Sequence, residues 1–404
     1  MKLHILDCAL LDKRGHHYEY VKSVYDEWVR RGLPASVYCH KMAQADILRY
    51  FNANGIFSRS IHNRSPLVPG FGKLNLLINF IVTNYVFYSE LKGGLPAARN
   101  PNDIYFIHTI DINQLFGLYA WYRSIRSEIR PRLALIFRLG AGDNPETRRY
   151  SRLLYKILFG AAFPLAEGKI YYFSDSIELA EEYGKLAKKR VSVLPIPHLP
   201  DAGAAGDKRI DEMLQVVYLG DARIEKGYHL LPAVVENILT KRNNVKFIIQ
   251  SNVPNDPPAE IVKAIEKIKA LPRNVECIVE PLDSKDYYSI LLHADVVLLP
   301  YSPELYHART SGIFAEAIAF GKPVIVPEGT WMERQIAEYG QCGFAMSGYS
   351  EESLEKSIDH VIDHREIFGL RAKSASDRWK KFHNPGTYVD MLIESIPPGN
   401  SATG

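Results

Sequence analysis

The sequence of 404 residues has little cysteine, no low-complexity segment and no long uninterrupted apolar run. Its four cysteines lie far apart, without a CxxC pair or the Cys/His spacing of a zinc site. This pattern argues against a disulfide framework and favours a reducing cytoplasm. With 47% hydrophobic and 24% charged residues, the chain has an ordinary globular composition, not a disordered or collagen-like one. Its length predicts two domains.

An export signal and a membrane-spanning segment are also lacking. Charged residues at 7 and 12–14 interrupt the N-terminal apolar stretch before it reaches a useful length, so we expect a cytoplasmic protein. The most apolar stretch, 74–88, contains Asn and Thr residues and falls short of the roughly 20 apolar residues that span a bilayer. Its apolar residues recur at helical spacing, which predicts an amphipathic helix packed on a sheet, with membrane-surface docking as the alternative.

The net charge of +3 is the sum of two unlike halves. Residues 1–197 carry 27 Lys and Arg against 17 Asp and Glu, a balance of +10. Residues 198–404 carry 22 against 29, a balance of −7. A basic first half fits an anionic partner such as a membrane surface or a lipid-linked phosphate, but basic clusters also occur on plain solvated faces. We do not expect a nucleic-acid partner, because no aromatic-interleaved basic stripe and no helix-turn-helix are present.

Short apolar runs alternate with helical segments, which is typical of parallel α/β folds. The runs are almost entirely apolar, as in sheets that helices cover on both faces. A Pro-rich stretch followed by the Gly- and Ala-rich segment 201–207 indicates a linker. We predict two doubly wound, Rossmann-like domains that face each other across a cleft. The predicted boundaries are 1–197 for the N-terminal domain, 198–212 for the linker, 213–380 for the second domain and 381–404 for a terminal segment.

The periodicity also predicts individual elements. Strands are expected near 2–7, 35–39, 103–108, 133–139, 169–174 and 191–194, and then near 214–219, 245–250, 275–279, 295–299, 322–326 and 342–346. Helices are expected near 16–31, 43–54, 73–91, 111–127, 145–160 and 176–186, and then near 228–241, 257–271, 284–293, 312–320, 331–339 and 351–364.

Two segments of the second half have the features of an anion site. Gly220 follows a predicted strand and precedes Arg223 and Lys226. Such a turn suits a phosphate, because Arg can form two parallel hydrogen bonds and Lys acts as a point charge; the alternative is a solvated loop. Ser311-Gly312 stands where a helix should begin, and exposed N–H groups there would favour a diphosphate. Glu316 lies one turn further on, where its carboxylate could accept hydrogen bonds from a ribose diol.

These segments resemble the GT-B glycosyltransferases, specifically the retaining, family-four-like enzymes of bacterial polysaccharide and glycolipid assembly. The resemblance is tightest from 216 to 326. Lys226 with the glycine that follows matches the basic pair ending in Lys-Gly that precedes the family's first helix in this domain. Glu316 and the Gly-Lys-Pro sequence at 321–323 match the family's second glutamate and the strand after it.

The sequence departs from the family at two points. The family's first glutamate, eight residues before the second, is replaced by Ala308. Glu304, four residues after the proline that ends the strand, or Arg309 could take its place. The arginine of the family's Gly-Arg pair is replaced by Asp221, and Arg223 could supply that charge from two positions later.

The resemblance also implies roles for other residues. His108 ends the strand whose histidine hydrogen-bonds the donor sugar in the family, and with Arg223 and Lys226 it forms the expected catalytic set. A terminal helix from 379 to 396 would cross back onto the first domain. Trp331 could stack on a sugar or fill the core. The further expected contacts are Gly15, Leu282 and Thr330 on the donor side, with Gly220, Glu304, Arg309, Ser311, Gly312 and Glu316, and His16, His17 and Arg138 on the acceptor side.

The implied activity is transfer of a hexose from a UDP- or GDP-sugar to a hydroxyl group of a carbohydrate or lipid-linked saccharide, with retention of configuration. No cofactor is expected. No metal is expected either, because no DxD pair suited to a diphosphate-bound cation is evident. Peripheral contact of the basic half with the inner membrane face is a further expectation. The alternatives are a sugar-nucleotide epimerase on the same fold and a degenerate protein that binds nucleotide sugars without turnover.

Overall fold

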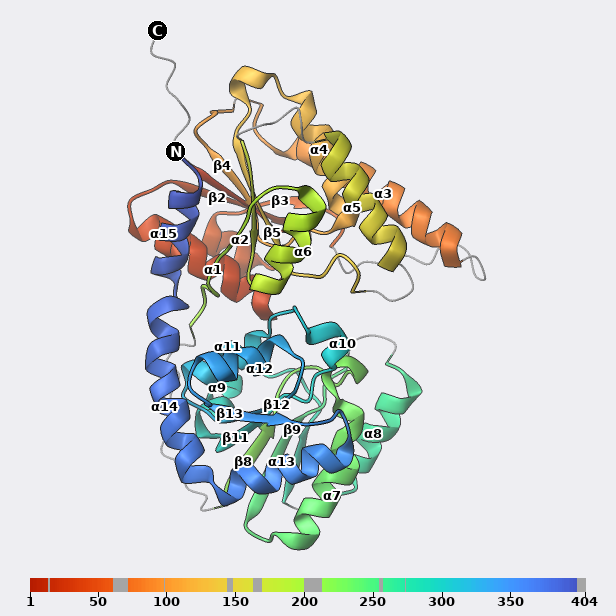
Figure 1. Ribbon diagram of the computed structural model, residues 1–404. Coiled ribbons are helices and arrows are strands. Elements are labelled where there is room, and N and C mark those ends of the chain that lie inside the picture. The colour runs from red at the N-terminus through yellow and green to blue at the C-terminus, as the bar shows by residue number, and fades with distance from the viewer. Residues whose placement is uncertain are drawn as a thin grey trace. The chain divides into compact units, whose positions relative to one another are not determined.

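The computed structural model describes residues 1–13, 15–60, 72–97, 99–143, 148–162, 169–199, 213–253, 257–272 and 274–397. The chain divides into two compact units, Met1–His198 with Pro385–Gly404, and Leu199–Asn384. Each unit is built on one parallel sheet (Figure 1). The segment expected to form the core of the linker, 201–207, lies outside the described residues.

The first unit has the strand order β3-β2-β1-β4-β5-β6-β7, and all neighbouring strands are parallel. Its strands are β1 (Leu3–Leu6), β2 (Ala35–His40), β3 (Asn54–Phe57), β4 (Ile104–Ile107), β5 (Arg132–Phe137), β6 (Ile170–Ser174) and β7 (Val191–Val193). Its helices are α1 (Gly15–Arg30), α2 (Ala45–Phe51), α3 (Gly72–Gly94), α4 (Ile112–Ser124), α5 (Arg148–Ala162), α6 (Ile177–Ala187) and α15 (Pro385–Ser395), with a 3-10 turn η1 (Ser127–Ile129).

The second unit has the order β10-β9-β8-β11-β12-β13, again parallel throughout. Helices α7, α8 and α13 share one core with the sheet, and α9, α11 and α12 lie on its other side (Figure 1). The strands are β8 (Leu214–Tyr218), β9 (Val245–Gln250), β10 (Val275–Ile278), β11 (Val296–Leu298), β12 (Val324–Pro327) and β13 (Gly343–Met346). The helices are η4 (Ile224–Lys226), η5 (Tyr228–Leu230), α7 (Leu231–Lys241), α8 (Ala259–Lys269), α9 (Ser284–His293), α10 (Pro303–Tyr306), α11 (Gly312–Ala319), α12 (Trp331–Glu338), α13 (Glu351–Asp363) and α14 (Arg365–Phe382).

The predicted fold class, two Rossmann-like α/β domains, is confirmed, but the helix expected at 43–54 is too long. Helix α2 ends at Phe51, because Asn52 takes a left-handed conformation with φ of 46° and donates its N–H to the last turn. The chain then forms strand β3, which the sequence analysis missed. Asn tolerates the left-handed region better than most residues, so this C-cap stops the helix and turns the chain back to the sheet.

The C-terminal segment forms two helices, not the single one expected at 379–396. Proline has no N–H and cannot continue a helix, so α14 stops at Phe382 and α15 begins at Pro385. Helix α15 packs on α1 within the first unit, where the hydroxyl of Tyr20 donates to that of Tyr388 over 2.9 Å. Arg31 of the same unit reaches Asp390 over 2.5 Å and the carbonyl of Gly386 over 2.9 Å. The end of the chain thus completes the core of the first unit.

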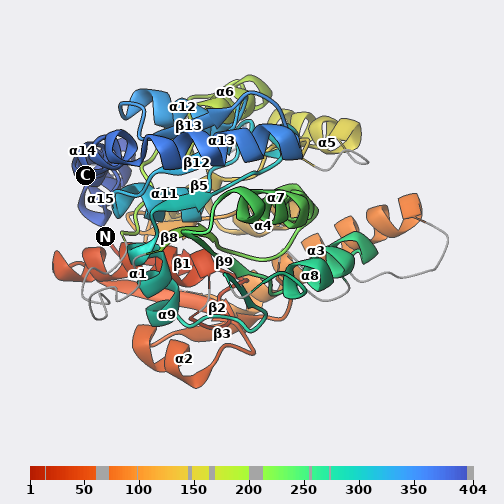
Figure 2. The ribbon, with the colours of Figure 1, turned by 90° about the horizontal axis from the view of Figure 1, so that it is seen from below.

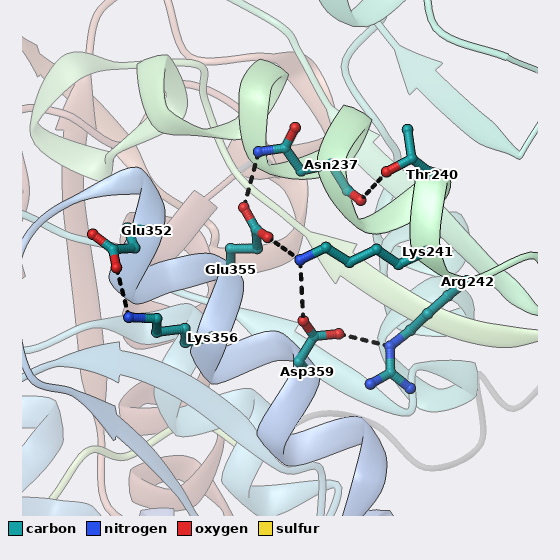
Figure 3. Close-up of polar contacts among 8 residues, drawn as sticks. All are labelled: Asn237, Thr240, Lys241, Arg242, Glu352, Glu355, Lys356 and Asp359. Carbon is teal, nitrogen blue, oxygen red and sulfur yellow. Dashed lines mark hydrogen bonds and ion pairs between the residues drawn. The ribbon is translucent and has the colours of Figure 1, made fainter.

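Ion pairs join two neighbouring helices of the second unit (Figure 3). Lys241 of α7 pairs with Glu355 of α13, whose other oxygen accepts a 2.9 Å hydrogen bond from Asn237. Arg242 donates to Asp359 over 2.6 Å, one turn further along α13. Many acidic residues of this half are therefore used to hold α13 against α7.

Glycine is required where the loop after β8 meets the end of β11. Gly227 has a φ of +71°, and a Cβ there would lie 2.0 Å from the carbonyl oxygen of Pro300. Gly329 has a similar φ of +78°, but a Cβ there would meet nothing closer than 3.9 Å. Substituting Gly329 therefore tests the cost of the positive φ alone, whereas substituting Gly227 adds the cost of a steric clash.

We expect Gly329→Ala to lower the free energy of unfolding by about 1–2 kcal/mol, from the positive φ alone. Gly227→Ala should cost roughly 1–3 kcal/mol more, because the methyl group also displaces the Pro300 carbonyl. Urea unfolding of both variants measures the difference. Equal losses would show that this loop can move away from β11 without cost.

Candidate functional site

The loop after β8 and the start of α11 meet at Gly220. This residue has a φ of +101°, and a Cβ there would lie 2.8 Å from both the Ile313 side chain and Nζ of Lys226. A side chain at 220 would therefore collide with the first turn of α11 and with the lysine. The glycine allows two segments more than 80 residues apart to converge at the carboxyl end of the sheet.

Lys226 brings a half-buried side chain and its ammonium group to this point. Burial lowers its pKa to about 8; the charges of Arg223 and Arg309 act in the same direction, while Asp221 and Glu225 oppose them. The ammonium lies over the ring of Tyr301, 5.7 Å from its centroid. Among the residues that the structure describes, none forms a hydrogen bond or ion pair with Nζ. A half-buried cation that forms no ion pair is a strong site for an anion.

Unlike Lys226, Arg223 has its positive charge balanced by two neighbouring carboxylates. Its guanidinium contacts Asp221 over 2.5 Å and Glu225 over 3.6 Å. Asp221 also accepts a 2.6 Å hydrogen bond from Asn252, which fixes the carboxylate in place. Asp221 stands where the family has an arginine, and Arg223 was expected to supply the missing charge. In the structure Asp221 forms an ion pair with Arg223. The role of Arg223 toward a diphosphate stays a prediction.

Helix α11 presents its N-terminus at the same place. Ser311 caps it, since its hydroxyl oxygen accepts from the N–H of Phe314 over 3.2 Å. The N–H groups of Gly312 and Ile313 have no intrahelical partner, because they belong to the first turn. Arg309, which precedes the helix, lies over the ring of Tyr306 at 5.5 Å and lowers the pKa of Lys226 through its charge. Two cations and a helix N-terminus therefore converge.

Glu316 is buried one turn into α11, as the sequence predicts. Its Oε2 accepts a 2.5 Å hydrogen bond from the hydroxyl of Tyr287, which α9 supplies. Burial raises the pKa of Tyr287 well above its usual value, and the adjacent Glu316 carboxylate adds to the effect, so this phenol stays a donor. The sequence analysis missed Tyr287, and no local motif marks it. A role of Glu316 toward a ribose stays a prediction.

The other predicted donor residues have different surroundings. Leu282 is half-buried in the loop between β10 and α9. Glu304 is exposed in α10, a one-turn helix in the loop between β11 and α11. Thr330 is fully buried; its hydroxyl donates to the carbonyl of Pro327 over 2.8 Å and accepts from the N–H of Glu333 over 3.2 Å. It caps α12, and a bound donor would have to compete with these two bonds.

Trp331 belongs to the core. The side chain is 3% exposed and packs edge-on against Phe314 and Trp379, at 5.4 and 6.5 Å between ring centroids. Of the two interpretations left open for this residue, core filling is correct.

In the first unit, four titratable residues stand in the first position after four neighbouring strands. Asp7 follows β1, His108 follows β4, Arg138 follows β5 and Asp175 follows β6. Because the strands are parallel, these positions lie along one edge of the sheet. The sequence analysis identified His108 and Arg138 but missed the two aspartates, although the same rule of strand ends would have found them.

Asp7 is the hub of this edge. Its Oδ2 accepts from Nδ1 of His17 over 3.0 Å and from Nε2 of His108 over 2.8 Å, and its Oδ1 accepts from the N–H of Ala9 over 2.8 Å. Burial alone would raise the pKa of this carboxyl group. The two histidines overcome burial through their charge and hydrogen bonds, and hold the pKa well below its usual range. Asp7 is therefore ionised.

These bonds occupy both nitrogens of His108. Nε2 faces Asp7, and Nδ1 lies 3.0 Å from the hydroxyl of Thr109. The ring also stacks on Tyr20 with 4.7 Å between centroids, and burial lowers its pKa, so it is neutral at pH 7. A neutral imidazole that donates from Nε2 can accept only at Nδ1. A bond from His108 to a sugar hydroxyl would therefore have to replace that of Thr109.

Arg138 has its own partner on this edge. Its Nε donates to Asp175 over 2.8 Å, and its guanidinium lies over the Tyr20 ring at 4.8 Å. Burial and the charge of Arg138 lower the pKa of His198 to about 4. The structure thus gathers His17, His108 and Arg138 as expected. Gly15 and His16 lie in the first turn of α1 and not in a loop, and their side chains are outside the described part of the chain.

Asp7, His17 and His108 are also the residues that could hold a metal ion. Their ligand atoms lie within 4.8 Å of one another, and two His with one carboxylate suit a transition metal. However, both rings already donate to the same carboxylate oxygen, and the charge of Arg138 reaches His108 and lowers its pKa. A metal ion could bind here only if the two histidines gave up their hydrogen bonds to Asp7.

Residues 206–378 match the family model of glycosyl transferases group 1. The predicted resemblance is confirmed. This match covers the Gly220 loop, Lys226, α11 and Glu316, and so includes the candidate anion site described above. Curated protein sequences yield no match.

Solved structures with the same fold cover both units. A sucrose-phosphate synthase from Thermosynechococcus elongatus has 14% identity and a TM-score of 0.67, over 98% of each chain. Anabaena HepE, solved with UDP-glucose, has 15% identity and a TM-score of 0.64, over 98% of this chain and 99% of its own. A UDP-N-acetylglucosamine 2-epimerase from Listeria monocytogenes has 14% identity and a TM-score of 0.58, over 98% and 95%. The fold is therefore GT-B, and transferases and an epimerase share it.

The Asp7 hub predicts a specific loss. Asp7→Asn retains one acceptor oxygen, which can serve either Ala9 or the two histidines but not all three. We expect unfolding in urea at pH 7 to require about 2–4 kcal/mol less free energy. The pKa of Asp7 is lower in the folded state, so its stabilisation is complete above its unfolded value near 4 and is lost as the pH falls below that value. The difference between wild type and variant should therefore shrink below pH 4.

Asp103→Asn is the matched control, because Asp103 also pairs with a buried histidine, His4, but over 3.5 Å and at the amino ends of the strands. Histidine ring NMR should show the signals of His17 and His108 shifting only in the Asp7 variant. Equal losses of stability in both variants would contradict the role of Asp7 as the hub.

Proposed function

We propose that the protein is a glycosyltransferase that moves a hexose from a UDP- or GDP-sugar to an acceptor hydroxyl group, with retention of anomeric configuration. One observation carries the proposal. The half-buried ammonium of Lys226 forms no ion pair or hydrogen bond among the described residues, and it lies beside the N-terminus of α11 in the region that matches the glycosyl transferase family.

The chemistry needs a stabilised leaving group. As the bond from the anomeric carbon to the nucleoside diphosphate breaks, negative charge grows on the phosphate oxygens. Lys226, Arg309 and the N–H groups at the start of α11 would stabilise this charge in a dry environment, with Arg223 nearby. These groups would do the work of a divalent cation, so we propose a metal-independent reaction. A phosphate oxygen would accept the proton of the attacking hydroxyl group, and Glu316 would bind the ribose.

The acceptor would bind at the first unit, where His17, His108 and Arg138 gather. We propose a carbohydrate or lipid-linked saccharide acceptor of polysaccharide, lipopolysaccharide or glycolipid assembly, at the cytoplasmic face of the inner membrane. The +10 balance of residues 1–197 supports an anionic surface or acceptor for this half.

Lys226→Met tests the donor site. Removing a half-buried, poorly compensated cation should raise the free energy of unfolding by roughly 1–3 kcal/mol, because the pKa of Lys226 is lowered to about 8 in the folded state. The same variant should lose the thermal shift that UDP or GDP gives the wild type, together with transfer activity. Lys267→Met, on an exposed turn of α8, should change neither property. Undiminished nucleotide binding by Lys226→Met would refute the site.

Nucleotide affinity should depend on pH in a defined direction. A bound diphosphate favours the charged lysine and raises its pKa, so binding takes up a proton above pH 8. The Kd of UDP or GDP should be nearly constant from pH 6.5 to 7.5 and rise roughly tenfold per pH unit above about 8.5. Calorimetry in two buffers with different ionisation enthalpies measures the proton uptake. A flat profile would show that Lys226 does not contact the nucleotide.

Two alternatives remain outcomes of the activity assay. The shared fold includes an epimerase, which would convert a nucleotide sugar without any acceptor. A degenerate protein would bind the nucleotide tightly without turnover. NMR of the product separates these outcomes from transfer and reports whether the configuration is retained.

A further inference from the structure

Helix α3 carries a stripe of exposed apolar side chains. Leu74, Leu77, Ile81 and Tyr85 recur at spacings of three and four, so they share one face of the helix, and each is 48–66% exposed. No residue from 74 to 83 is buried. The helix was expected to pack along a sheet; among its described side chains, burial begins at Asn84.

The anchor of α3 is a close contact with α4. The side chain of Asn84 accepts from the N–H of Gly117 over 2.9 Å, and a Cβ at Gly117 would lie 2.1 Å from the Asn84 carbonyl oxygen. From this point the first turns of α3 extend beyond the rest of the unit (Figures 1 and 2). The apolar stripe is therefore held out on a rigid helix.

Helix α5 carries a second stripe of the same kind. Tyr150, Leu153 and Ile157 are 52–59% exposed and lie on one face, at positions i, i+3 and i+7. Arg149 and Lys156 are exposed directly beside them. Helices α3 and α5 both pack against α4 and project on the same side of the first unit in both views (Figures 1 and 2).

Beside the two exposed stripes the charges have one sign, whereas Glu90, near the C-terminal end of α3, pairs with Lys41 over 3.4 Å. The segments 72–89 and 148–162 contain five Lys and Arg and no Asp or Glu. A surface for a second protein copy would place these cations against each other, which is unfavourable. An anionic bilayer offers both an apolar interior for the stripes and negative headgroups for the flanking cations. A monomeric soluble protein rarely exposes apolar side chains in such a concentration.

We propose that the exposed stripes of α3 and α5 form a docking face for an anionic membrane surface, into which their apolar side chains insert at headgroup depth. This inference deepens the membrane contact proposed above and does not depend on the transfer reaction. Within the part of the chain that the structure describes, no helix has the length and apolar character to cross a bilayer. The contact would be peripheral and reversible.

The first experiment measures co-sedimentation of the full-length protein with vesicles. Equal parts of phosphatidylglycerol and phosphatidylcholine provide the anionic surface, and pure phosphatidylcholine is the comparison. We expect binding only to the anionic vesicles, with the bound fraction falling steeply between 50 and 500 mM salt. Equal binding to both compositions, or no binding, would overturn the proposal.

Variants then locate the face. Leu153→Ser with Ile157→Ser should weaken vesicle binding about tenfold or more, since each buried CH₂ adds to insertion. Leu370→Ser, which removes a 73% exposed leucine from α14 in the second unit, is the control and should change nothing. The thermal unfolding midpoints should remain close to that of the wild type, because the substituted side chains are exposed.

Charge reversal tests the electrostatic part. Each cation lost should weaken vesicle binding roughly fivefold. The double variant Arg149→Glu with Lys156→Glu should therefore weaken it about thirtyfold or more. Lys263→Glu with Lys267→Glu on α8 changes the net charge equally and is the control. Equal effects of both pairs would show that net charge, and not this face, governs binding, and would overturn the assignment of the surface.

A tryptophan probe reports insertion directly. All four native tryptophans are 3% exposed or less, so they give a constant background. Ile81→Trp and Leu153→Trp should each show blue-shifted emission with anionic vesicles and quenching by brominated lipid, whereas Leu370→Trp should not. If the stripes instead mediate self-association, sedimentation velocity without lipid will show a dimer that Leu153→Ser with Ile157→Ser dissociates. That result, without insertion of either probe, would overturn the proposal.

Discussion

The direction of the strands is the constraint on which both units depend. In a parallel sheet every strand delivers its next residue to the same edge, so the fold brings chemically active side chains together without any local motif. Asp7, His108, Arg138 and Asp175 are the first residues after four neighbouring strands of the first unit. In the second unit the same edge receives the Gly220 loop and the start of α11. The strand topology thus fixes where these residues lie, and the types of residue at these positions determine what the edge can bind.

The two edges differ in how their charges are balanced. At the edge of the first unit two buried charges have partners of their own: Asp7 has two histidines, and Arg138 has Asp175. Such an edge is rigid before any ligand arrives, and an acceptor would meet preformed groups. In the second unit Arg223 is balanced by Asp221, whereas the ammonium of Lys226 lies over the ring of Tyr301 and forms no ion pair among the described residues. A desolvated cation without an ion pair lowers the free energy of unfolding. Such a residue is expected where a bound anion restores the lost stability.

The sequence predicted the parallel α/β architecture because long apolar runs and helical spacing are local signals. Most strand and helix ranges agree with the structure to within a few residues, but α14 begins at Arg365, well before the expected start at 379, and α10 was not expected. The sequence prediction failed where one residue decides an element. Asn52 stops α2 by its left-handed conformation, and Pro385 separates α14 from α15. Site prediction succeeded where a motif is continuous, as from Ser311 to Glu316. It missed Tyr287 because its partner Glu316 is 29 residues away and meets it only in the fold, whereas Asp7 could have been found from its position directly after a strand.

The charge asymmetry between the halves has a structural counterpart. In the second unit α13 supplies Glu355 and Asp359 to Lys241 and Arg242 at the end of α7. In the first unit, α5 carries cations without a single acidic residue, and its exposed apolar side chains stand among them. A charged residue that pairs with another residue of its own unit helps to hold two helices together. A cation that lies beside exposed leucine and isoleucine is instead available to an external partner. The location of the basic residues is therefore more informative than the sum of +10, because it separates a charged fold from a charged face.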